Sequence, residues 1–256
     1  IINASVPSVT TTDASAIAQF STTLSGNVTD AGGSAVTSKG IVYSITATNA
    51  NPLIGGTGVT QDTNGTGTGT FSESITSLLP NTKYSFKAYA INSSGTVYGE
   101  VKTFTTLALV TPTIVLTDMS KTYGDANFDL AATSNSSGAI TYLIVGTANG
   151  TSLSGTNNKT VTLGNAGTIT VRASQAANGI YKANTKDIAL TIGKATLTAT
   201  ADDKSRDYGE ANPAFTVSYS GFKGSDTVTD LDVLPTASST ATATTNAGTV
   251  DITITG

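Results

Sequence analysis

The chain has 256 residues, only 12% of them are charged, and the formal net charge is −4. Its Lys and Arg residues are scattered, which argues against nucleic acid as a partner, because neutralising phosphates requires a clustered basic face. The sequence contains no His and no Cys, which excludes a disulfide framework and most metalloenzyme, Ser-His-Asp and Cys-His mechanisms. Thr fills roughly a fifth of the positions and no helical apolar period is present, so the fold is predicted to be all-β.

The first predicted domain covers residues 1–106 and consists of short strands separated by turns rich in Gly, Asn and Ser. The expected strands are residues 17–28, 40–46, 69–75, 84–91 and 97–105. Short strands with regular turns are typical of a β-sandwich. Residues 51–69, rich in Gly and Thr, are expected to form a long, solvated surface loop.

A motif near the end of this domain carries a family resemblance. The segment from Leu78 to Tyr84 has the spacing Leu-x-Pro-x-Thr-x-Tyr, with Pro80 and Thr82 between its ends. It resembles the tyrosine corner of fibronectin type III domains, where the Tyr packs into the core and its hydroxyl bonds to a nearby main-chain group. The resemblance implies a fibronectin-like sandwich with structural roles for Leu78, Pro80 and Tyr84. The chain departs from that family in having no Trp.

The rest of the chain contains one module twice. Tyr123-Gly124-Asp125-Ala126-Asn127 returns 85 positions later, from 123 to 208, as Tyr208-Gly209-Glu210-Ala211-Asn212. Asn165-Ala166-Gly167 returns 81 positions later, from 165 to 246, as Asn246-Ala247-Gly248. Two segments in the same order at nearly the same offset indicate a tandem repeat of roughly 80 residues. The second and third predicted domains are therefore residues 107–193 and 194–256.

Both repeats resemble a bacterial adhesin Ig-like module, called mucin-binding-like, whose hallmark is Tyr-Gly-Asp/Glu-x-Asn-Pro. The third domain matches through Pro213, whereas the second carries Phe128 at that place. The resemblance implies structural roles for Tyr123, Gly124, Tyr208, Gly209 and Pro213. The two Tyr side chains are expected to anchor the first strand of each repeat in its sandwich, with a sugar-stacking platform as the alternative.

The third domain is expected to lack its closing strand. After Gly167 the second repeat continues through residues 187–192, which are expected to form its closing strand, whereas the third stops at Gly256. That would leave an open sheet edge, which promotes association. A boundary in the sequence is favoured over a slot that receives a strand from elsewhere. The joints at 106–112 and 192–195 are short, which favours an extended rod of three sandwiches.

Candidate ligand sites are few. Two acidic clusters are candidate Ca²⁺ sites, although solvated turns are favoured, and no other cofactor is expected. Thr227 lies in Asp226-Thr227-Val228, which resembles the Asp-Ser/Thr-aliphatic acceptor of O-glycosylation in Bacteroidota. The clusters consist of Asp202, Asp203 and Asp207, and of Asp226, Asp230 and Asp232.

The combination of modules resembles the large surface adhesins of gliding Bacteroidota. That resemblance implies a non-catalytic stalk segment on the bacterial cell surface, with adhesion or gliding as the wider role. Its partners would be surface polysaccharides or glycans and the flanking repeats of the same parent protein. The alternative is a set of spacer modules in an extracellular polysaccharide-degrading enzyme. No apolar run approaches the ~18 residues of a membrane span, so insertion into a membrane is not expected.

Overall fold

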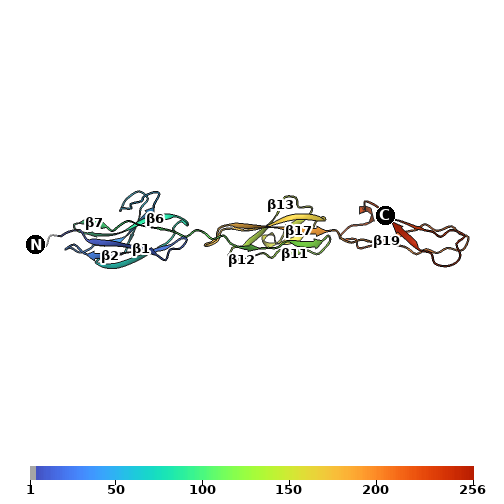
Figure 1. Ribbon diagram of the computed structural model, residues 1–256, viewed down its shortest axis with the longest axis horizontal. Coiled ribbons are helices and arrows are strands. Elements are labelled where there is room, and N and C mark those ends of the chain that lie inside the picture. Colours follow the sequence, from blue (N-terminus) through green and yellow to red (C-terminus); the bar gives the residue numbers. More distant parts are fainter. Residues whose placement is uncertain (1–3) are drawn as a thin grey trace. The chain divides into compact units, whose positions relative to one another are not determined.

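The computed structural model describes residues 4–256, so the first three residues of the predicted first domain lie outside the described part. The described chain is all-β, and the predicted class of tandem β-sandwiches is confirmed (Figure 1). It divides into two compact units. The first unit comprises Ile1–Thr111 with Gly179–Lys182, and the second comprises Pro112–Asn178 with Ala183–Gly256.

The first unit contains two sheets. One has the order β1-β2-β5, and the other has the order β4-β3-β6-β7, with β8 also paired to β6. The strands are β1 (Ser8–Ser15), β2 (Thr22–Asp30), β3 (Ser38–Ile45), β4 (Thr60–Thr63), β5 (Gly69–Ile75), β6 (Lys83–Asn92), β7 (Gly95–Tyr98) and β8 (Lys102–Thr105).

A hydrophobic core fills the space between these sheets. Leu24 and Val28 of β2 and Phe71 of β5 contribute from one sheet, and Ile41 and Phe86 from the other. Because side chains alternate across a strand, the even-numbered residues of β2 from Thr22 to Val28 are buried, while residues 23, 25 and 27 stay half-exposed. Aromatic rings pack within this core: Phe86 meets Phe104 edge-on, with ring centroids 5.9 Å apart.

The predicted strand at 97–105 is interrupted in the structure. Residues 99–101 separate β7 from β8, so β6 loses a continuous strand partner at this edge. The hydroxyl of Thr11, from β1, fills the gap by accepting a hydrogen bond from the Ala88 N–H at 3.1 Å. Gly99 permits this approach, since a Cβ atom there would lie 2.5 Å from the Thr11 Oγ1.

Two strands of the first unit were not predicted. β1 reads Ser-Val-Thr-Thr-Thr-Asp-Ala-Ser, which has no apolar alternation, and it forms because β2 offers an edge to it. β4 lies inside the predicted surface loop at 51–69 and pairs antiparallel with β3. The prediction of a loop is therefore wrong for residues 60–63, which form a strand at the edge of β3, although most of residues 51–69 are exposed or half-exposed as expected.

The part of the second unit that precedes Lys194 forms three small sheets. Their orders are β10-β17-β16-β13, β11-β15-β14 and β12-β9. The strands are β9 (Ile114–Val115), β10 (Met119–Thr122), β11 (Phe128–Asp129), β12 (Thr133–Ser134), β13 (Ile140–Val145), β14 (Ser152–Ser154), β15 (Thr160–Thr162), β16 (Gly167–Gln175) and β17 (Asn184–Gly193). A single-turn 3-10 helix, η1 (Thr156–Asn158), precedes β15.

This region has its own hydrophobic core, built mainly from the four-stranded sheet. Val171 of β16 and Leu190 of β17 are fully buried, and Val161 of β15 packs against them from the smaller sheet. β17 is the central element: it pairs antiparallel with β16 and parallel with β10. The apolar run predicted at 187–192 lies within β17.

Residues 194–256 form two separate pairs of strands. β18 (Thr198–Ala201) pairs with β19 (Val217–Ser220), and β20 (Thr236–Ser239) pairs with β21 (Ile252–Thr255), with η2 (Val228–Asp230) between the pairs. The strands keep an alternation of half-exposed and exposed residues, but none of the described side chains here is buried. The inward-facing side chains of these four strands are therefore only half-buried.

Candidate functional site

The tyrosine-corner motif lies at the start of β6. Leu78 and Tyr84 are buried, Pro80 is half-buried, and the Leu79 N–H donates a hydrogen bond to the Tyr84 hydroxyl at 2.9 Å. The Tyr84 ring stacks on Phe104, with centroids 5.3 Å apart. This arrangement ties the segment before β6 to the core and gives these side chains a structural role.

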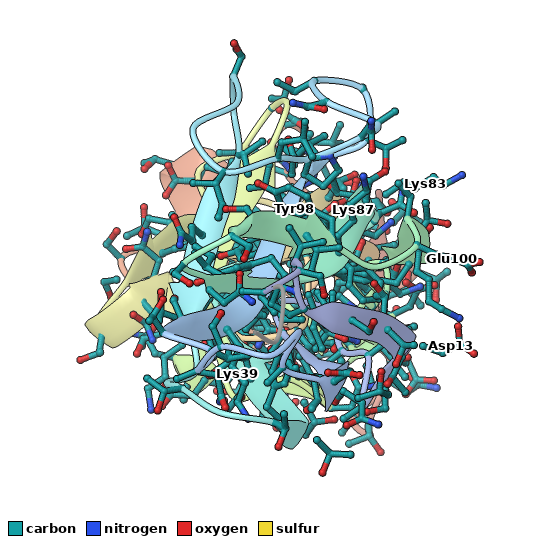
Figure 2. The ribbon with its side chains drawn as sticks, turned by 90° about the vertical axis from the view of Figure 1, so that its left-hand side faces the viewer. Asp13, Lys39, Lys83, Lys87, Tyr98 and Glu100 are labelled. Atoms are coloured by element: carbon teal, nitrogen blue, oxygen red, sulfur yellow. The ribbon has the colours of Figure 1, made fainter. Side chains whose placement is uncertain are left out.

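The outer face of the larger sheet carries a buried lysine. Lys87 of β6 is only 9% exposed, and its amine lies 5.6 Å from the centre of the Tyr98 ring. Figure 2 shows Lys87 beside Tyr98. The segment before β4 folds over this face, since the Ile54 N–H donates to the Tyr98 hydroxyl at 3.1 Å. Burial lowers the pKa of the Lys87 amine, and the electron-rich ring face offsets part of the cost of enclosing a cation.

Tyr89 occupies the same outer face and is fully buried. Its hydroxyl lies 2.9 Å from the Gln61 amide, which donates to it, and 2.9 Å from the Thr63 hydroxyl. A fully bonded hydroxyl under a folded segment indicates a structural role rather than an open ligand platform.

The two Tyr-Gly turns differ in their surroundings. Gly124 and Gly209 both adopt left-handed backbone conformations, with φ of 80° and 92°, which favour glycine. Tyr123 is half-buried and packs against the core around Leu190. Tyr208, in contrast, is 69% exposed. The structure therefore does not bury Tyr208 in a sandwich core as the prediction expected, whereas Tyr123 does pack against one.

Tyr123 also makes a polar contact within the second unit. Its hydroxyl donates a hydrogen bond to Asp226 at 3.1 Å, and this bond raises the pKa of the Tyr123 phenol. The two residues line a cavity of about 300 Å³, together with Lys194, Lys223 and Asp230.

The six predicted calcium ligands are not gathered into a metal site. Within residues 4–256, no group of three or more acidic side chains is arranged to hold a metal ion. The Asp202 carboxylate accepts hydrogen bonds from the Ser218 and Thr216 hydroxyls, which lower its pKa. Asp203, Asp207 and Asp232 are exposed on the surface. Calcium binding stays a prediction.

Asp230 serves a local structural purpose. Its carboxylate accepts hydrogen bonds from the Thr227 N–H at 2.8 Å and from the Thr227 hydroxyl at 3.1 Å, which caps η2. Thr227 is exposed. The hydroxyl of the predicted glycosylation site is therefore at the surface but engaged by its neighbour.

A groove of about 470 Å³ lies in the last part of the chain. Residues 204–208 form one wall and residues 245–250 form the other, while Pro213, Phe215 and Ile252 contribute apolar surface. Of the predicted site residues, Asp207, Tyr208 and Pro213 are brought together here.

Several structurally important polar residues were missed by sequence reasoning. The Tyr142 hydroxyl accepts from the Ala132 N–H at 2.8 Å, much as Tyr84 does in the first unit. Buried Gln175 accepts a hydrogen bond from the Ser134 hydroxyl at 2.7 Å and donates to the Ser136 carbonyl at 3.2 Å. Buried Asn92 donates to the carbonyls of Ser5 and Ala31. A polar residue within an apolar run is the only signal that could have indicated them.

Comparisons with known proteins identify one family model. A model described as "MBG domain (YGX type)" matches residues 197–256, the segment that contains Tyr208 and Gly209. Together with the all-β fold, this match confirms an Ig- or fibronectin-like repeat module. The finer adhesin architecture stays a prediction, and the comparison with curated proteins gives no match.

Solved structures give distant likenesses. The sensor domain of the anti-sigma factor RsgI4 of Pseudobacteroides cellulosolvens is 24% identical, covering 41% of this chain and 98% of that chain, with a TM-score of 0.34. The fibronectin(III)-like modules of Clostridium thermocellum CbhA are 17% identical over 73% of this chain and 95% of that chain, with a TM-score of 0.27. The chicken CNTN1 FN1-FN3 domains are 12% identical, covering 98% of this chain and 84% of that chain, with a TM-score of 0.30. These scores are too low to carry an argument about function.

None of the helices in the described residues is long and apolar enough to cross a membrane.

Proposed function

We propose that this chain is a non-catalytic repeat segment of a large bacterial cell-surface adhesin and acts mainly as a stalk. The observation that carries the proposal is a series of β-modules in which separate hydrophobic cores are built locally, one around Leu24 and Phe86 and another around Val171 and Leu190. Modules that bury their own cores can be repeated in series, and each repeat lengthens the polypeptide without new chemistry.

The use of the acidic side chains supports a non-catalytic role. Asp187 is paired with Arg172 at 2.7 Å, and Asp129 is paired with Lys159 at 2.8 Å. Asp230 caps η2, and Asp202 accepts hydroxyl hydrogen bonds. Carboxylates held in this way stabilise turns and strand pairs. In this proposal the protein is extracellular and the segment adjoins the flanking repeats of the parent protein. A surface glycan is the partner of the parent protein as a whole, as in the adhesins of gliding Bacteroidota that the modules resemble.

The proposed cell-surface location of the protein is tested by labelling intact cells of the source organism with antibodies raised against the 256-residue chain. Surface labelling, with an antibody to a cytoplasmic protein as the control for cell integrity, is the expected result. Labelling that requires permeabilised cells would contradict the proposal. A deletion of the gene is expected to reduce surface adhesion or gliding.

The adhesive role is tested separately with a glycan array and with mucin- and polysaccharide-coated surfaces, each with calcium and with EDTA. A stalk is expected to give no saturable binding. Saturable binding to one class of glycan would make the segment adhesive in its own right. A gain of binding with calcium would assign a ligand-binding role to one of the acidic clusters.

A further inference from the structure

Two lysine side chains of the first unit are buried without an acidic partner. Lys39 is 6% exposed and Lys87 is 9% exposed, and the ion pairs within residues 4–256 include neither of them. Enclosing an ammonium group without a counter-charge is unfavourable, so the surroundings must offset that cost. The Tyr98 ring does so for Lys87 on the outer face of the larger sheet, whereas Lys39 lies apart from that pair (Figure 2).

Lys39 points into the space between the two sheets. It follows the same alternation along β3 as Ile41 and Tyr43, whose side chains belong to or pack against the hydrophobic core. Its amine donates a hydrogen bond to the Thr68 carbonyl at 3.2 Å and lies 5.5 Å from the centre of the Phe71 ring, which belongs to the other sheet. The amine is therefore enclosed at the edge of the core.

Asn64 lies opposite Lys39 at this edge. Gly40 of β3 pairs with Thr63 of β4, and the Asn64 N–H donates to the Lys39 carbonyl at 2.8 Å. Residues that lie opposite each other on antiparallel strands have Cβ atoms about 5 Å apart. Because lysine carries its amine on a flexible four-carbon stem, the Lys39 amine can turn from the Thr68 carbonyl to the Asn64 carboxamide.

Glu73 of β5 adds a carboxylate to this group. The Asn64 Nδ2 donates hydrogen bonds to the Glu73 carboxylate and, at 3.2 Å, to the Ser72 carbonyl. Glu73 is half-buried, and Leu24, its partner in β2, belongs to the core, so the Glu73 side chain also faces inward. An amine, a carboxamide and a carboxylate therefore lie at one edge of the sandwich, and the carboxylate contacts the nitrogen of the carboxamide.

We propose that Lys39 and Asn64 form an intramolecular amide cross-link and that Glu73 catalyses its formation. The unprotonated Lys39 amine attacks the Asn64 Cγ, so that an Nζ–Cγ bond forms and the Cγ–Nδ2 bond breaks. The Glu73 carboxylate accepts the proton that the amine loses and transfers it to Nδ2, which leaves as ammonia. An amine and a primary amide become a secondary amide and ammonia, so the reaction needs no oxidant, reductant or cofactor.

The fold supplies the proximity that this reaction requires. Because paired strands hold the amine and the carboxamide together, their encounter becomes a unimolecular step. The link closes residues 39–64 into a covalent loop that contains β4 and the segment folded over Lys87. Such a closure removes conformational freedom from the unfolded chain and so stabilises the first unit. The inference does not depend on the cellular location of the protein or on an adhesive role.

Mass spectrometry of the intact 256-residue chain tests the cross-link. The parent chain is expected to be lighter than its sequence by one molecule of ammonia, and Lys39→Arg is expected to have the full mass of its sequence. Lys87→Arg is the matched control, because it replaces the other buried lysine, and it is expected to retain the mass deficit. A folded parent chain that keeps the full mass of its sequence after incubation would overturn the proposal.

A second reaction of Asn64 removes the same mass. Attack of the Gly65 main-chain nitrogen on the Asn64 carboxamide gives a succinimide and ammonia without any lysine, so a deficit that persists in Lys39→Arg would overturn the proposal. The parent chain also distinguishes the two reactions. Cleavage before each Asp yields fragments 30–61 and 62–117, which carry Lys39 and Asn64 respectively. These fragments are expected to stay joined, and their separation would contradict the cross-link.

The role of the carboxylate is tested by Glu73→Gln. The variant keeps the size of the side chain but cannot accept the proton, so the cross-link is expected to form about 10²-fold more slowly or worse. The linked fraction is followed by intact mass during cell-free synthesis. Glu100→Gln is the control, because Glu100 is exposed and lies outside this group, and it is expected to leave the rate unchanged. Cross-linking of Glu73→Gln at the parent rate would overturn the assignment of Glu73 as the catalyst.

Discussion

Single hydroxyl groups satisfy main-chain groups that the strands leave unpaired. Tyr84 accepts from the Leu79 N–H, Tyr142 from the Ala132 N–H, and Thr11 from the Ala88 N–H. A buried donor that loses its acceptor costs about 1–3 kcal/mol, more than the net gain of an average hydrogen bond. Among these three donors, Ala88 is fully buried. These positions are therefore sensitive even to substitutions that preserve shape.

The substitution Thr11→Val tests the cost of removing an acceptor, at the interruption between β7 and β8. The variant keeps the shape of the side chain but leaves the Ala88 N–H without its acceptor. We expect the opening free energy of the Ala88 amide, measured by hydrogen exchange in NMR spectra, to fall by about 1–3 kcal/mol. Thr12→Val is the matched control, because Thr12 is the next residue of β1 and is exposed. Unchanged exchange at Ala88 in Thr11→Val would show that another group accepts the bond.

At the scale of the element, strands were predictable where burial imposes a pattern. The prediction for β6 was within one residue at each end, because a long apolar run must lie in the centre of a sheet. β1 and β4 were missed because their residues are polar, and only a neighbouring strand edge makes them extended. The groove could not be predicted, since its two walls, residues 204–208 and 245–250, are about 40 positions apart in the sequence.

Among the candidate site residues, too, some were predicted correctly from the sequence and others were not. Tyr84 lies where the fibronectin-like spacing implied, because seven consecutive residues fix that corner locally. Tyr208 is not buried as expected: it is 69% exposed, although Tyr123 at the same position of its repeat is half-buried. Local motifs could thus be predicted from the sequence, whereas burial that depends on other segments of the chain could not.

The pairing of β16 with β17 makes a further prediction at this scale. Arg172 donates two hydrogen bonds to Asp187 across the strands, at 2.7 and 2.8 Å, and these bonds hold the pKa of the Asp187 carboxyl below its ordinary value. Because the pKa is lower in the folded state, the pair stabilises the fold above the unfolded-state pKa of ~3.9. That contribution is lost as the pH falls through the folded-state pKa.

Carboxyl titration by NMR measures this directly. Asp187 is expected to titrate below ~3.9 in the parent chain and near that value in Arg172→Gln. An ordinary Asp187 pKa in the parent chain would mean that the ion pair is not maintained in solution. The pair is exposed, so added salt is expected to reduce the shift.

At the scale of the whole molecule, the chain contains separate cores rather than one. The first is centred on Leu24, Ile41 and Phe86, and the second on Val161, Val171 and Leu190. Residues 194–256 contribute no buried side chain to either. A single free energy of unfolding is therefore not expected to describe the molecule.

Two matched substitutions test whether the cores unfold separately. Tyr84→Phe removes an acceptor in the first core and Tyr142→Phe removes the corresponding acceptor in the second. Each loss of about 0.5–1.5 kcal/mol is expected to lower one calorimetric transition by about 4–8 °C per kcal/mol, and to leave the other transition in place. A shift of both transitions by either variant would show that the cores are coupled, and a series of independent modules would then no longer describe the chain.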